Sequence, residues 1–166
     1  MSSLGVAWDI LRHQMRAFLL TWNPRRWEWT DLPDAIRMTQ QGGKYEHPWS
    51  TGGSRRIQPG DRVFLFKQGP EPRVIVAAGT AISDCYLDEH WDENKAGQQT
   101  HFVKVSFEIV LPPELSTLLL DEDLNSGTLV TVNWKTRRSG IEIPRDASTQ
   151  LEHRWQEHLR RLGILG

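Results

Sequence analysis

The stretch Phe18-Leu-Leu-Thr-Trp-Asn-Pro-Arg-Arg-Trp-Glu-Trp29 runs from a short apolar segment into tryptophans and arginines. Residues 18–22 are predicted to form the first strand, and Pro24 ends it because proline cannot donate a hydrogen bond to a sheet. Folding alone does not require tryptophans beside Arg25 and Arg26. These residues offer flat stacking surfaces and guanidinium donors, which suit nucleobases and phosphates. The stretch therefore predicts both a strand and a binding site.

The composition indicates one ordinary globular domain. The chain has 166 residues, of which 38% are hydrophobic and 25% are charged. Its longest apolar runs, such as residues 74–78, are far shorter than the roughly 20 residues of a membrane-spanning helix. Residues 1–15 lack a signal-peptide core and are interpreted as a leader or short helix. We expect residues 16–163 to form the domain, with a cytoplasmic location and no membrane partner.

Charge is unevenly distributed, although the formal net charge is only −1. Residues 12–73 carry 11 Lys+Arg against 6 Asp+Glu, net +5; residues 84–123 carry 2 against 10, net −8; residues 124–166 carry 7 against 4, net +3. If the two basic segments meet in the fold, they form one face that attracts polyanions. The alternative is that these arginines are simply solvated surface residues.

The pattern of apolar residues predicts a mixed α+β domain. Strands are expected at residues 18–22, 62–67, 73–82, 101–110, 128–134 and 141–143. A short helix is expected at 32–39, with Asp31 as N-cap and Pro33 in its first turn, and a terminal helix should bury Leu151, Trp155, Leu159 and Leu162. A curved mixed sheet or small β-barrel with flanking short helices fits this order.

Three segments carry weaker expectations. Residues 42–53 are rich in glycine, serine and proline and are expected to form a loop. Residues 115–124 are expected to form a helical turn or two. In the strand at 101–110, Val103, Val105, Phe107 and Ile109 are expected to share one face.

Metal and nucleophile chemistry is not visible in the sequence. The six histidines show no zinc-motif spacing, because His153 and His158 are five apart and so point to different faces of a helix. The single cysteine, Cys85, lies in an acidic stretch that raises its pKa, and it is interpreted as a buried structural thiol. We therefore predict no catalytic residue, metal site or cofactor.

Aromatic and basic residues form a stronger pattern. Trp22 and Trp134 each end a predicted strand, and Trp49 lies in the predicted loop. If these ends converge, they form a flat-walled pocket with Arg55, Arg56, Arg137 and Arg138 around its mouth, which suits an extruded base. The alternative is that the tryptophans are core residues, which we prefer for Trp155, Trp27 and Trp29. Because Trp49 is expected in a loop, its loss should cost little stability.

The ordered motifs Phe18–Pro24, Trp49-Ser50, Gly60–Gly69, Ile75–Gly79 and Trp134–Ile143 resemble the EVE-like branch of the PUA superfamily over about residues 16–160. The resemblance extends to the N-terminal reader modules of modification-dependent restriction endonucleases that carry an HNH nuclease. It implies a PUA-like fold that flips 5-methylcytosine or 5-hydroxymethylcytosine of double-stranded DNA into an aromatic cage. No HNH signature occurs within the 166 residues, so we expect a non-enzymatic reader, either the reader part of a larger protein or a stand-alone reader, and any nuclease activity would belong to a fused or associated domain.

The resemblance also assigns residues by position. The base-binding residues would be Trp22, Asn23, Trp49, Ser50, Trp134, Ser139 and Gly140. From the pattern of basic residues we assign phosphate binding to Arg25, Arg26, Arg55, Arg56, Lys135, Arg137 and Arg138. Two alternatives stay open: a reader of modified RNA with the same fold, and a small-molecule or nucleotide-processing enzyme that uses Asp84, His90 or His101.

Overall fold

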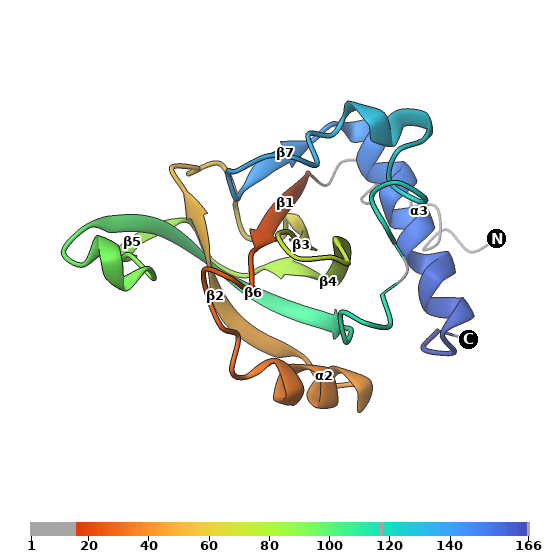
Figure 1. Ribbon diagram of the computed structural model, residues 1–166, viewed down its shortest axis with the longest axis horizontal. Helices are drawn as coiled ribbons and strands as arrows, with labels where there is room; N and C mark the ends of the chain where they lie inside the picture. The colour runs from red at the N-terminus through yellow and green to blue at the C-terminus, as the bar shows by residue number, and fades with distance from the viewer. Residues whose placement is uncertain (1–15, 117, 166) are drawn as a thin grey trace.

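The computed structural model describes residues 16–116 and 118–165 (Figure 1). The leader or short helix expected at residues 1–15 lies outside these ranges. The elements, in chain order, are β1 (Ala17–Trp22), α2 (Leu32–Gln40), β2 (Tyr45–Gly52), β3 (Arg62–Lys67), β4 (Val74–Ala81), β5 (Tyr86–Glu89), η1 (Glu93–Lys95), β6 (Gln99–Val110), η2 (Gly127–Thr131), β7 (Ile141–Ile143) and α3 (Arg145–Arg161).

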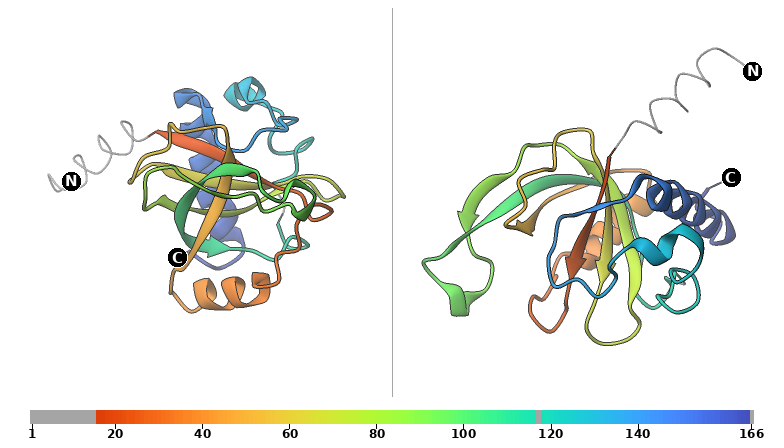
Figure 2. Two further views of the ribbon diagram at one scale, coloured as in Figure 1. Left: turned by 90° about the vertical axis from the view of Figure 1, so that its left-hand side faces the viewer. Right: turned by 90° about the horizontal axis from the view of Figure 1, so that it is seen from above.

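The strands form one mixed sheet in the order β2-β6-β4-β3-β1-β7, and β5 pairs with the first residues of β6, from Gln99 to Phe102. Strand β1 runs parallel to β3, whereas every other pairing is antiparallel. The sheet curls strongly without closing, as the views in Figure 2 show. The expected curved mixed sheet with flanking helices is therefore confirmed, in its open rather than its barrel form.

Both faces of the sheet are buried, and each carries its own core. Leu19 and Phe64 pack with Trp155 of α3 on one face, whereas Phe18 and Leu20 pack with the tryptophans inside the curl on the other face. This arrangement explains why β1 is apolar at consecutive positions. Trp155 is fully buried, which confirms its expected core role.

Helix α3 covers the sheet as expected, with one exception in its apolar stripe. Leu151 and Leu159 are buried beside Trp155, but Leu162 follows the last helical residue and is 39% exposed. Arg62 ties this helix to the sheet because its guanidinium pairs with Glu152 of α3 and with Glu108 of β6. No helix among residues 16–116 and 118–165 is long and apolar enough to cross a membrane.

Two segments differ from their expected secondary structure. Residues 45–52, expected within a loop, form β2 and pair antiparallel with β6. The glycines and Pro48 favoured the loop interpretation, but Pro48 fits because β2 is the edge strand of the sheet. Residues 127–131, expected within a strand, form the 3-10 helix η2, whose Leu129 is buried in the core next to α3.

Strand β6 is longer than expected and contains a bulge. Its register with β4 shifts between Ala78 and Gly79, so that Glu108 has no Cα partner on β4. The extra residue reverses the alternation: Phe107 packs inside the curl, but Ile109 packs against the α3 core. The expected single face is therefore wrong at Ile109. The pairing partner β5 was not expected at all.

The remaining local expectations hold in part. Residues 112–116 and 119–124 form isolated hydrogen-bonded turns, in line with the expected helical turn or two. Asp31 occupies the N-cap position of α2 and a proline follows in the first turn, but the Asp31 carboxylate does not cap the helix. It accepts a hydrogen bond from the Tyr45 hydroxyl instead, at 3.3 Å.

Candidate functional site

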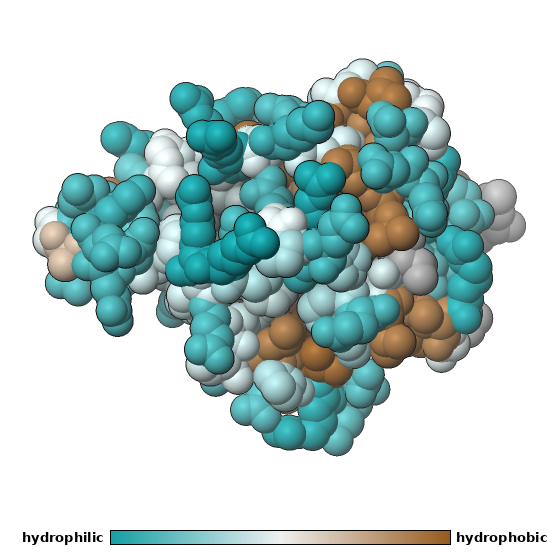
Figure 3. Space-filling model, viewed as in Figure 1, coloured by the Kyte–Doolittle hydropathy of each residue, from teal (hydrophilic) through white to brown (hydrophobic). Residues whose placement is uncertain are grey.

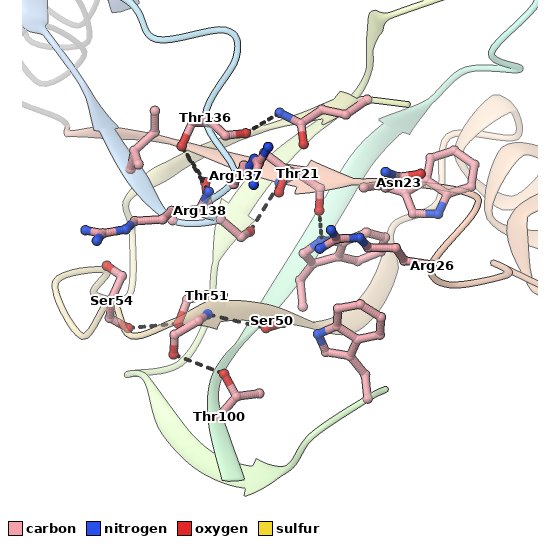
Figure 4. Close-up of a pocket in the computed structure, with 18 of the residues that line it drawn as sticks. Thr21, Asn23, Arg26, Ser50, Thr51, Ser54, Thr100, Thr136, Arg137 and Arg138 are labelled. Atoms are coloured by element: carbon pink, nitrogen blue, oxygen red, sulfur yellow. Dashed lines mark hydrogen bonds between the residues drawn. The ribbon is translucent and has the colours of Figure 1, made fainter. Parts of the chain in front are cut away.

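A cavity of about 1310 Å³ opens where the end of β1, the middle of β2 and the segment before β7 meet. The β5–β6 hairpin leaves the sheet as an arm beside it (Figure 1) and contributes a further part of the lining. In Figure 4, Arg137 and Arg138 lie on the β7 side of the pocket, whereas Ser50, Thr51 and Ser54 lie on the β2 side. Three segments that are far apart in sequence therefore share one site.

All the residues assigned to base binding line this cavity: Trp22, Asn23, Trp49, Ser50, Trp134, Ser139 and Gly140. The curl of the sheet brings them together, because β1 and β2 face each other across it. One hydrogen bond links these strands directly, from Trp49 Nε1 to the Thr21 carbonyl at 3.0 Å. The convergence required by the sequence hypothesis is thus present, whereas the role of each residue remains a prediction.

The three assigned tryptophans are more deeply buried than expected. Trp22, Trp49 and Trp134 are 6%, 5% and 6% exposed, respectively. Their indole N–H groups donate to the carbonyls of Trp27, Thr21 and Leu129, each at 3.0 Å. Each therefore offers only a small part of its ring to the pocket and also stabilises the fold. The expectation that Trp49 lies in a loop and contributes little stability is wrong, because β2 holds it inside the core.

Between β1 and β2, the more accessible aromatic lining comes from Trp27 and His47, both half-buried. Tyr45, His47 and Trp49 alternate along β2 and so share one face, with ring centroids 5.7 and 5.8 Å apart. Trp27 packs edge-on against Trp49 at 5.2 Å and lies 5.8 Å from His47. The period-two aromatic pattern could have revealed both β2 and this wall, but the glycine and proline content of the segment obscured it.

The segment from Trp134 to Gly140 is fixed to the ends of β1 and β3. The Thr21 backbone N–H donates to Ser139 Oγ at 3.1 Å, and Gln68 Nε2 donates to the Thr136 carbonyl at 2.6 Å. Gly140 has φ +84°, and a Cβ atom there would lie 3.1 Å from the side chains of Thr51 and Ser54. Only glycine allows this close approach without strain.

Hydrogen-bond donors remain available on both sides of the cavity. Ser139 Oγ and Ser50 Oγ each accept a backbone N–H, so their hydroxyl protons are free to point into the pocket. The backbone N–H groups of Lys135, Arg137 and Ser139 have no partner among the described residues. Asn23 is partly used by the fold, because its Oδ1 accepts the Arg25 N–H at 3.0 Å and packs against Gly69.

The residues assigned to phosphate binding divide into three groups. Arg26, Lys135, Arg137 and Arg138 line the cavity, are exposed and form no ion pair within residues 16–116 and 118–165. Arg56 also lines it but pairs with Glu142. Arg25 and Arg55 are exposed and do not line it. The two basic segments of the chain therefore meet at one site. Figure 3 shows that hydrophilic side chains cover much of the molecule in the view of Figure 1, with separate hydrophobic patches among them.

The arm adds His90, Trp91 and Lys95 to the lining, together with Thr100 and Phe102 of β6. Sequence reasoning missed Trp91, although a lone tryptophan in an acidic stretch without apolar periodicity was an available signal. Burial, aided by the nearby Lys95, lowers the pKa of His90. Its Nδ1 accepts the Asp92 backbone N–H at 3.0 Å, which also favours the neutral ring.

The residues weighed for catalysis do not assemble into one group. His90 lines the cavity, Asp84 does not, and His101 Nδ1 lies 3.3 Å from the Gly52 carbonyl. Cys85 is half-buried, and burial, with a further contribution from Asp84, raises the pKa of its thiol. Within the described part of the chain, no three His, Cys, Asp or Glu side chains are placed to hold a metal ion.

Comparison with known proteins assigns the family. The EVE domain model matches residues 16–153, and the chain belongs to this family. No curated protein matches the sequence significantly. Solved structures share the fold at low sequence identity. A hypothetical protein from Leishmania major is 14% identical with a TM-score of 0.59, and the match covers 91% of this chain and 99% of that one.

Two further structures support the same fold. A Pseudomonas syringae protein is 14% identical with a TM-score of 0.58, and the match covers 82% of this chain and 97% of that one. Human THYN1 protein is 12% identical with a TM-score of 0.54, covering 82% of this chain and 95% of that one. The THYN1 structure is a complex with DNA that contains 5-methylcytosine.

Proposed function

We propose that this chain is a modified-base reader that binds double-stranded DNA and holds an extruded 5-methylcytosine or 5-hydroxymethylcytosine in the cavity between β1, β2 and β7. The observation that carries the proposal is the convergence, in one cavity, of aromatic surface, hydrogen-bond donors and four cations that form no ion pair among the described residues. An extruded base needs the first two, and its flanking phosphates need the third. That a protein of the same fold, human THYN1, is solved with 5-methylcytosine DNA supports this choice of ligand.

The lining residues take distinct parts in this proposal. Trp27 and His47 offer ring faces for stacking, while the buried Trp22, Trp49 and Trp134 offer ring edges around the 5-substituent. Cytosine presents acceptors at O2 and N3, which suit the hydroxyls of Ser50 and Ser139 and the backbone N–H groups before Gly140. Asn23 adds an amide donor at the end of β1.

The cations hold the backbone of the nucleic acid. Arg26 lies on one side of the cavity mouth, and Lys135, Arg137 and Arg138 lie on another. Contacts of this kind position the duplex but carry no sequence information. The resemblance to the reader modules of HNH restriction endonucleases supports a role as the recognition module of such a system, with the nuclease in a separate domain.

A binding assay with matched probes tests the proposal. One duplex sequence is prepared with cytosine, 5-methylcytosine or 5-hydroxymethylcytosine at a single position, and each Kd is measured by fluorescence anisotropy in one buffer. Burial of one methyl group is worth about 1 kcal/mol, so the methylated duplex should bind roughly fivefold more tightly. Equal values for all three duplexes would overturn the proposal. Preference for a methylated RNA over every duplex would favour the RNA-reader alternative.

A further inference from the structure

Trp91 differs from the other tryptophans in the described part of the chain. Trp22, Trp27, Trp29, Trp49, Trp134 and Trp155 belong to the two core clusters or pack against them, whereas Trp91 contributes to neither. Among the residues that the structure describes, its ring pairs only with that of His90, at a centroid distance of 5.1 Å and an interplanar angle of 33°. A half-buried indole that lines the cavity without serving the core is a candidate for ligand contact.

The tip of the arm is held in a defined shape. The His90 backbone N–H donates to the Gln98 carbonyl at 2.9 Å, which closes the hairpin beyond β5. Asp92 accepts the Asn94 N–H at 2.9 Å and caps the 3-10 helix η1. Trp91 lies between these fixed points, so its backbone is held in place before any ligand arrives, which lowers the entropy cost of binding.

The charge of the arm indicates which part of a nucleic acid it contacts. Residues 84–98 carry five carboxylates and one lysine, Lys95. Phosphates are repelled from such a surface and attracted to the arginines on the β7 side of the cavity. The net negative charge of residues 84–98 therefore favours contact of the arm with bases over contact with the backbone, although Lys95 is the charged residue of this segment that lines the cavity. The neutral ring of His90 fits this assignment, because stacking on a base requires no charge.

The cavity is large enough for a second base. Its volume of about 1310 Å³ exceeds the roughly 300–1000 Å³ that is usual for a site holding one small ligand. The aromatic wall formed by Trp27 and His47 and the pair formed by His90 and Trp91 are separate clusters on different elements. Extrusion of one base also exposes the stacking face of its neighbour in the duplex.

We propose that Trp91, supported by His90, forms a second stacking subsite on the β5–β6 arm, which binds the nucleobase adjacent to the modified base. This inference rests on the proposed function and extends it to the flanking nucleotide. It makes the arm the part of the protein that senses sequence context. A purine neighbour, which has the larger stacking face, should bind more tightly than a pyrimidine.

Coupling between the side chain and the neighbouring base tests the subsite. Duplexes with one 5-methylcytosine carry a normal or an abasic neighbour on its 5′ or 3′ side, and each is titrated with the wild-type protein and with Trp91→Ala. Loss of one stacked base should weaken wild-type binding about 5- to 150-fold for the neighbour on one side. The same abasic probe should change binding by Trp91→Ala less than about twofold.

Control variants distinguish this outcome from others. Trp91→Tyr should keep the coupling and Trp91→Leu should lose it, whereas Leu87→Ala should behave as wild type because Leu87 is 56% exposed on the same arm outside the cavity. Thermal melts should show wild-type stability for all of them. An abasic effect that persists in full in Trp91→Ala would overturn the inference. It would leave the proposed function intact as long as the wild-type protein still prefers the methylated duplex.

Discussion

Replacing Arg137 and Arg138 together by glutamine should reduce the salt dependence of DNA binding without changing its selectivity. Both guanidiniums are exposed on the cavity rim and form no ion pair among the described residues, so each is available to one phosphate. Each neutralised phosphate adds about −0.9 to the slope of log K against log salt concentration on duplex DNA. Loss of both contacts should therefore make the slope shallower by about 1–2 units.

A matched variant removes the same charge elsewhere. Arg160 and Arg161 are exposed at the C-terminal end of α3 and do not line the cavity. Changing these two to glutamine should leave the slope within about 0.3 units of wild type if contact, rather than net charge, sets it. Anisotropy titrations at several salt concentrations give both slopes. Equal slopes for the two double variants would refute the assignment of the rim, and a collapse of the ratio between methylated and unmethylated duplex would mean that Arg137 or Arg138 reads the base.

Three further predictions concern stability. Trp49→Ala should lower the free energy of unfolding by about 3–5 kcal/mol, as much as Trp155→Ala, because both indoles are buried. Urea denaturation compares the two variants, and a decrease below about 1 kcal/mol for Trp49→Ala would contradict the position of Trp49 in the core. Gly140→Ala should cost more than about 1 kcal/mol because φ is +84° and the new Cβ meets Thr51, whereas an unchanged melting temperature would mean that the segment relaxes freely. Burial, with a contribution from Arg161, lowers the pKa of His158, so the folded state binds fewer protons than the unfolded state. The stabilising contribution of the neutral His158 is therefore complete above about pH 6.5 and declines as the pH falls. Urea midpoints measured against pH should show a flatter decline for His158→Gln, and an unchanged decline would mean that another group causes it.

Local sequence patterns predicted the parts of the fold that local physics decides. Strands β1, β3 and β4 are short apolar runs bounded by turn residues, and the stripe formed by Leu151, Trp155 and Leu159 marks a helix wherever it packs. The order of the predicted elements indicated a curved sheet or small barrel, and the family resemblance implied the same PUA-like fold. The loop prediction was wrong at residues 45–52 because the pairing of β2 with β6 outweighs the local preference of the glycines and the proline in β2. The bulge at Glu108 was not predicted, because the register of β6 against β4 depends on tertiary structure rather than on local sequence.

The sequence predicted which residues line the candidate site better than it predicted how exposed these residues are. Sequence order and resemblance selected residues that do line one cavity, because the curl brings the end of β1, the middle of β2 and the segment before β7 together. Burial of Trp22, Trp49 and Trp134 depends on packing between distant elements, which no local pattern reports. The same holds for Arg56, whose partner Glu142 lies 86 positions away in sequence.

The position of the methyl group in the complex tests the central claim most directly. A duplex with an isotope-labelled methyl group on its single 5-methylcytosine can be followed by NMR as the protein is added. A methyl group held inside the cavity lies against Trp27 and Trp49, whose ring currents should move its resonance well away from that of the free duplex. The account predicts this shift at saturation, and its strong reduction in Trp27→Leu. A methyl resonance that stays at its free-duplex position while the protein is fully bound would contradict the account.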